Sequence, residues 1–142
     1  MKGQIITAKC VDLSFEGKGV AKYEKGVVFV DGLFPGEEAE IEITYVRAGT
    51  SFGIVKKLLK LSKDRIQPRC PVCTTCGGCQ FQQLSYNAQL EFKKNKVKNA
   101  FSRTAKMDVV VNDVIGMEDP YFYRNKIQMP VGKDRFGKII TG

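Results

Sequence analysis

The chain has 142 residues and a net charge of +8, with 43% hydrophobic and 27% charged residues. This composition excludes a disordered chain, and the length excludes a complete dinucleotide-binding or barrel enzyme. No apolar run approaches the roughly 20 residues of a transmembrane helix and no signal peptide is recognisable, so we expect a cytoplasmic protein without membrane contact.

The first sixty residues predict five short strands separated by glycine-containing turns, at residues 4–13, 20–23, 27–30, 38–45 and 51–59. The stretch 38–45 is the clearest, because apolar residues alternate with charged or polar ones, as in a half-buried strand. Five such strands favour a closed barrel of the OB type; a five-stranded sandwich and an SH3-like barrel are the alternatives.

Three residues of this region have predicted environments. Cys10 lies on the first expected strand and is interpreted as a small core residue. Phe15 and Phe34 lie in loops beside the barrel, where each either stacks on a nucleic-acid base or is buried in the barrel core.

A cluster of cysteines follows the barrel. Four of the five cysteines, Cys70, Cys73, Cys76 and Cys79, fall within ten residues. In a cytoplasmic protein this pattern indicates a metal or redox site, and the absence of histidine leaves an iron–sulfur cluster or a four-thiolate zinc site. The C-x2-C-x2-C spacing resembles a ferredoxin run more than a zinc ribbon. Because four cysteines this close can hardly all ligate one cluster, we expect at least one bystander.

A basic helix is predicted next, with Ser85 as its N-cap. One face of this helix carries an apolar stripe, formed by Tyr86, Leu90, Val97 and Phe101. The region 84–106 holds six Lys or Arg against one Glu, and the net charge is +1 over 1–60 but +7 over 61–142. Such a surface favours a polyanion such as nucleic acid as partner; the alternative is a merely solvated helix face. Residues 107–115 and 126–131 have the composition of strands.

Several sequence words resemble one family. LSFEGKGVA (13–21), VFV (28–30) and PGE (35–37) resemble a TRAM domain, an OB-like RNA-binding barrel. The spacing Cys70-x5-Cys76-Gly-Gly-Cys79-Gln80, the segment 83–93 and YRNKIQMPVG (123–132) resemble the RNA uracil-5-methyltransferases, the last word lying at the start of their central domain. In this order the three features are highly specific to that family.

The resemblance implies an S-adenosylmethionine-dependent enzyme that makes 5-methyluridine in RNA, with 23S ribosomal RNA favoured over transfer RNA. In that family a cysteine thiolate adds to C6 of uracil before C5 accepts the methyl group. A [4Fe-4S] cluster is also implied, with Cys70, Cys76 and Cys79 as its first three ligands and a fourth from later in the chain. Cys73 is additional to this pattern. With only three ligands we expect a labile site, metal-free or holding zinc instead.

We therefore predict a mainly β chain with one helix, in three parts. These are a five-stranded OB-like TRAM barrel over 1–60, a linker and iron–sulfur cysteine loop over 61–83, and a basic helix with the truncated start of an α+β central region over 84–142. The methyltransferase domain would follow residue 142, so no residue is assigned a catalytic role and the chain alone is expected to be inactive. The alternative is an autonomous small RNA-binding or iron–sulfur electron-transfer protein.

Six basic side chains are expected to contact RNA phosphates. They lie near the barrel turns, on the helix and in the downstream word: Lys18, Lys22, Lys94, Lys98, Arg124 and Lys126. No protein partner is inferred.

Overall fold

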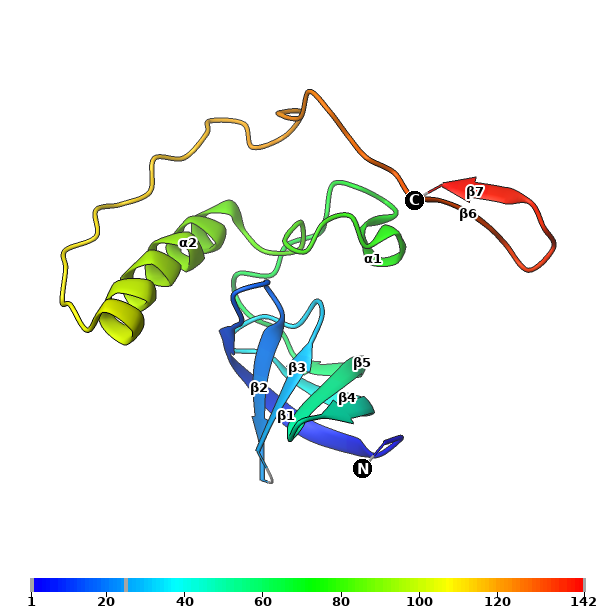
Figure 1. The fold of residues 1–142 in the computed structure, drawn as a ribbon, viewed down its shortest axis with the longest axis horizontal. Coiled ribbons are helices and arrows are strands. Elements are labelled where there is room, and N and C mark those ends of the chain that lie inside the picture. The colour runs from blue at the N-terminus through cyan, green and yellow to red at the C-terminus, as the bar shows by residue number, and fades with distance from the viewer. Residues whose placement is uncertain (1, 25, 142) are drawn as a thin grey trace.

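Five strands close into a barrel at the N-terminal end of the computed structural model, which describes residues 2–24 and 26–141 (Figure 1). The strands are β1 (Ile5–Leu13), β2 (Gly19–Tyr23), β3 (Gly26–Val30), β4 (Glu38–Arg47) and β5 (Thr50–Lys60). Their order around the barrel is β1-β2-β3-β5-β4, with β3 and β5 parallel and the other neighbours antiparallel. The predicted OB-like closed barrel is confirmed, and the sandwich is excluded.

The barrel core follows the alternation of the sequence. On β4, Ala39, Ile41 and Ile43 are fully buried, whereas the intervening residues stay partly exposed. Cys10 on β1 is also fully buried, as predicted, and burial raises the pKa of its thiol to about 12. Close packing explains Gly53 on β5, because a β-carbon there would lie 2.8 Å from the carbonyl oxygen of Glu42.

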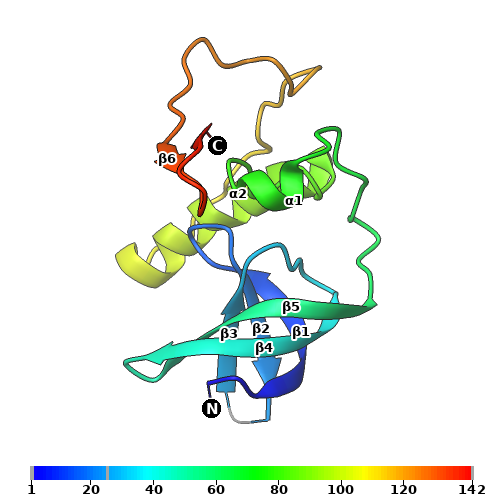
Figure 2. The same ribbon diagram turned by 90° about the vertical axis from the view of Figure 1, so that its right-hand side faces the viewer.

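A second, smaller core joins the barrel to the following segment. Leu13 and Phe34 from the barrel pack with Leu84, and Phe81 and Phe92 lie against them. Phe92 belongs to helix α2 (Tyr86–Ala100), which lies across one end of the barrel (Figure 2). The helix begins as predicted, at Ser85, whose side chain accepts a hydrogen bond from the backbone of Ala88 at 3.4 Å.

A buried ion pair fixes this arrangement. The carboxylate of Glu37 is fully buried and accepts hydrogen bonds from Nε and Nη2 of Arg65 at 2.6 and 2.8 Å. The backbone N–H groups of Phe34 and Ser62 donate to the same carboxylate at 2.9 and 3.2 Å. Four donors therefore compensate the removal of this charge from water.

The guanidinium of Arg65 extends the network beyond the barrel. It donates to the carbonyl oxygen of Gly32 at 2.7 Å and to the side chain of Gln83 at 3.2 Å, and it lies 4.8 Å from the ring centroid of Phe34. Next to it, Ile66 donates to the carbonyl oxygen of Gln83 at 2.9 Å, and Ser85 donates to that of Asp64 at 2.8 Å. The linker and the segment before α2 are thus paired side by side, and they close the base of the cysteine loop.

The apolar stripe predicted on the helix is only partly correct. Tyr86 and Leu90 do make contacts, but with the returning chain at Gly116, where a β-carbon would lie 2.9 Å from Leu90 Cδ1. Val97 and Phe101 remain 46% and 40% exposed, and Phe101 belongs to a π-helical turn, η1 (Phe101–Ala105), rather than to α2. The contacts with the barrel come instead from the face that carries Phe92.

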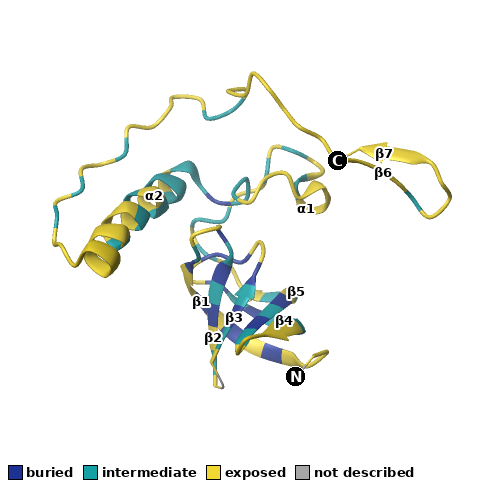
Figure 3. Ribbon diagram, in the orientation of Figure 1, coloured by how far each residue is buried: buried dark blue, intermediate teal, exposed yellow. Residues whose placement is uncertain are grey.

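The strands expected downstream of the helix are largely wrong. Over 107–130 the structure shows no strand, and this part of the chain is mostly exposed (Figures 1 and 3). Val110 and Ile115 are 94% and 98% exposed. Only β6 (Val131–Lys133) and β7 (Ile139–Thr141) pair with each other, as an exposed hairpin. Strand composition is not sufficient, because a strand also needs a neighbour for its backbone hydrogen bonds, and these residues have none among those described.

Neither α2 nor the short helices elsewhere in the described part of the chain are long and apolar enough to cross a membrane.

Removing one member of the buried ion pair should destabilise the whole chain. Glu37→Ala leaves Arg65 and two backbone donors without their acceptor, so we expect a loss of about 3–5 kcal/mol in the free energy of unfolding. Denaturant titration followed by circular dichroism measures this loss. The matched control is Lys56→Ala, which breaks the exposed pair between Lys56 and Glu42 and should cost less than about 1 kcal/mol. Equal losses for the two variants would contradict the central role of Glu37.

Candidate metal centre and nucleic-acid interface

The four clustered cysteines lie together on the loop that follows the linker. Cys73 and Cys76 bound a single helical turn, α1 (Cys73–Cys76), which ends at Gly77 in a left-handed conformation with φ of 70°. This φ explains the glycine, because a residue without a β-carbon adopts the left-handed conformation at little cost. All four thiols are free; Cys70 and Cys73 are half-buried, and Cys76 and Cys79 are exposed.

A glutamine that sequence reasoning missed connects the two ends of this loop. Nε2 of Gln82 donates to Sγ of Cys79 at 3.3 Å, and its Oε1 accepts a hydrogen bond from the backbone of Cys70 at 3.2 Å. Nothing in the sequence distinguishes Gln82 from the neighbouring Gln80 and Gln83, so only the structure identifies its position. An amide that donates to a thiolate sulfur orients it and stabilises its negative charge.

The charges of the other three thiols affect Cys73. Its pKa is raised above the ordinary value by burial and, to a smaller extent, by the charges of Cys79, Cys70 and Cys76. Thiolates are the ligand type of iron–sulfur clusters and of four-cysteine zinc sites, so the chemistry of these four side chains fits either group. Over residues 2–24 and 26–141, no three His, Cys, Asp or Glu side chains converge on a single-ion position.

The downstream segment passes beside the cysteine loop, a contact that the sequence did not predict. The guanidinium of Arg69 lies 4.8 Å from the ring centroid of Tyr121 and 5.2 Å from that of Phe122. The pKa of Arg124 is raised, chiefly by a hydrogen bond with Tyr123 and slightly by the charge of Cys79. These contacts place the start of the YRNK word near the thiols.

The six basic residues expected to contact RNA differ in whether they already form ion pairs within the chain. Lys18 and Lys94 form ion pairs with Asp31 and Asp113, each at 2.7 Å. The hydrogen bond from Lys94 lowers the pKa of Asp113, and that of Lys94 is raised in turn. Lys22 and Lys98 are exposed and have no acidic partner among the ion pairs of the described residues.

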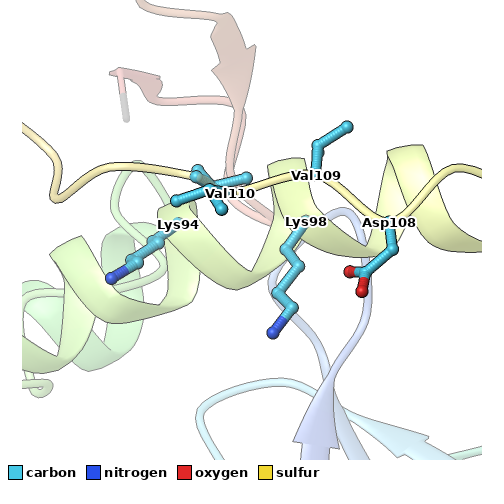
Figure 4. Close-up of a pocket in the computed structure, with 6 residues that line it drawn as sticks. Lys94, Lys98, Asp108, Val109 and Val110 are labelled. Atoms are coloured by element: carbon cyan, nitrogen blue, oxygen red, sulfur yellow. The ribbon is translucent and has the colours of Figure 1, made fainter.

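Two open pockets are lined by these predicted residues. Lys94 and Lys98 line one of about 310 Å³ between α2 and residues 108–111 (Figure 4). Arg124 and Lys126 line another of about 550 Å³, formed by residues 124–128 of the exposed chain. The structure thus groups four of the six basic residues in two pairs.

The two phenylalanines have different environments. Phe34 is fully buried in the second core, which excludes it from base stacking. Phe15 is 78% exposed, and the ammonium of Lys96 from α2 lies 3.4 Å from its ring centroid. Lys96 also donates to the backbone carbonyl of Phe15, so this pair holds the β1–β2 loop against the helix.

Comparison with known proteins finds a match to the barrel segment and matches to most of the chain. Residues 1–56 match the TRAM domain. The chain is 42% identical over 142 residues to an uncharacterized RNA methyltransferase of Oceanobacillus iheyensis and 39% identical over 142 residues to one of Halalkalibacterium halodurans, alignments that cover 99% of this chain and 30% and 31% of those proteins. A third, from Clostridium tetani, is 43% identical over 89% of this chain and 27% of its own length. The chain thus spans somewhat under a third of the relatives that it matches.

Proposed function

The chain is a TRAM-domain relative of bacterial RNA methyltransferases, and we propose that it forms the RNA-binding and cluster-holding region of an S-adenosylmethionine-dependent RNA uracil-5-methyltransferase. The observation that carries the proposal is the match of 99% of the chain to RNA methyltransferases, with the closed barrel lying in the TRAM part. The CGGCQ and YRNK words resemble those of the RNA uracil-5-methyltransferases and in this way support uracil C5 as the methylated atom. As substrate we propose 23S ribosomal RNA rather than transfer RNA.

The barrel and the basic segments would bind the RNA backbone. Lys22 and Lys98 offer ammonium groups that form no ion pair with the described residues, and Arg124 and Lys126 lie on exposed chain. Contacts of this kind position a nucleic acid without reading its sequence. The role of this region would thus be to hold the RNA while the reacting uracil is bound elsewhere in the enzyme.

The cysteine loop would hold the [4Fe-4S] cluster through Cys70, Cys76 and Cys79, with a fourth thiolate from outside residues 1–142. When bound, the cluster supplies iron–thiolate bonds that cross-link the loop. Gln82 would keep the sulfur of Cys79 oriented, and the paired linker segments would fix the base of the loop. Arg69 would hold residues 121–122 against it.

Nucleoside analysis tests the proposed reaction directly. We expect deletion of the gene that carries this chain to remove one 5-methyluridine from 23S ribosomal RNA and to leave transfer RNA unchanged, as measured by mass spectrometry of the digested RNAs. Complementation with the intact gene is the control and should restore the nucleoside. Loss from transfer RNA alone would overturn the choice of substrate, and unchanged 5-methyluridine in both RNAs would overturn the proposed reaction.

Serine variants test the ligand assignment. After anaerobic reconstitution of the chain with iron and sulfide, Cys70→Ser, Cys76→Ser and Cys79→Ser should each abolish the visible absorption of the cluster, because each removes a thiolate ligand. Cys73→Ser should keep most of the absorption and of the bound iron. Cys10→Ser, far from the loop in the barrel core, controls for general effects of losing a thiol. If Cys73→Ser is as damaging as the other three, a local four-cysteine site replaces the proposed ligand set.

A further inference from the structure

Three aromatic side chains form a row across the outer face of the barrel. Strand register places Phe29 of β3 beside Phe52 of β5, and Phe52 beside Tyr45 of β4. The rings of Tyr45 and Phe52 are stacked, with centroids 4.5 Å apart and planes at 8°. Phe29 and Phe52 are 5.7 Å apart and tilted by 30°. None of the three belongs to the barrel core.

The row is open at Tyr45. The register of β1 with β4 runs only from Glu38 to Glu42, so β4 extends past the paired part of the barrel before it reaches Tyr45. Tyr45 is 48% exposed, and Phe29 and Phe52 are partly exposed. Because Phe52 covers only one face of the tyrosine ring, the other face can continue the stack with a further flat ring.

The charges near the row suit a polyanion. Arg47 lies two residues beyond Tyr45 on the same strand face and is exposed, without an ion pair among the described residues. The carboxylates of Glu42 on β4 and Asp31 after β3 form ion pairs with Lys56 and Lys18, whereas Asp12, which the register of β1 and β2 places in line with Phe29, forms none among the described residues. Lys22 lies on β2, in the next row of the same face.

We propose that Phe29, Phe52 and Tyr45 form a base-stacking platform for single-stranded RNA, with Arg47 and Lys22 as flanking phosphate contacts. The proposal rests on the proposed RNA-binding function and specifies that the barrel binds RNA in its single-stranded form. A flat π-face accepts every base, so the platform holds a strand without selecting its sequence. Duplex RNA does not fit, because its bases are already stacked on each other.

Binding to paired oligonucleotide probes tests the platform. The 142-residue chain should bind a single-stranded oligouridine of roughly ten nucleotides about 5- to 150-fold more tightly than an abasic strand of equal length, since only the former offers bases to stack. Fluorescence anisotropy at fixed salt measures both affinities. Tyr45→Leu and Phe52→Leu should remove the preference, whereas Tyr45→Phe should keep it. Phe136→Leu, at an exposed ring in the turn between β6 and β7, is the matched control and should change nothing.

Salt titration separates stacking from charge. Tyr45→Leu should weaken binding without changing the slope of affinity against salt, whereas Arg47→Gln should reduce the slope by about 0.7. Circular dichroism verifies folding, and Phe29→Leu replaces any aromatic variant that fails to fold.

Four results would overturn the proposal. If the wild-type chain binds both strands equally, or if Tyr45→Leu retains the preference for bases, the aromatic row does not stack them, although RNA binding by the chain stands. If the wild-type chain binds neither strand nor structured ribosomal RNA, the proposed RNA-binding function fails as well. If the leucine variants lose self-association in light scattering while RNA affinity is unchanged, the row is a contact between copies of the chain.

Discussion

The buried ion pair between Glu37 and Arg65 is the interaction on which the arrangement of the chain depends. Transfer of both charged groups from water costs several kcal/mol, and a pair of this kind is stable only when its remaining donors and acceptors are satisfied. Here they are satisfied by parts of the chain that would otherwise be independent: the loop before β4, Ser62 in the linker after β5, and Gln83 beyond the cysteines. One ion pair therefore connects the barrel, the linker and, through Arg65, the approach to α2.

This connection gives the two proposed sites a fixed relation to each other. The cysteine loop leaves and returns through the paired segments beside Arg65, and α2 starts directly after them. Lys96 on α2 then holds Phe15 of the β1–β2 loop, a second contact between helix and barrel. An RNA strand on the barrel and a group held by the thiols would thus be bound to parts of the chain that contact each other directly.

Features that depend on local sequence were predictable, and features that depend on distant pairing were not. Alternation on β4, the cap at Ser85 and the burial of Cys10 follow from residues within one element. The aromatic row requires the parallel register of β3 with β5, which no local pattern reveals. Phe34 is buried because Leu84, fifty residues away in the sequence, covers it. Strand-like residues after the helix form no strand, because no other part of the described chain pairs with them.

Native-state hydrogen exchange tests most directly whether Glu37 and Arg65 unite the chain. The backbone N–H groups of Ile66 and Ser85, which pair the linker with the approach to α2, should exchange with the same opening free energy as those of buried Val28 and Ile41 in the barrel. In Glu37→Ala the opening free energies of these two sets of N–H groups should differ. Ile66 and Ser85 should then exchange through the easier opening. If Ile66 and Ser85 already exchange by a much easier opening in the wild-type chain, the barrel and the cysteine loop are independent units and the account is wrong.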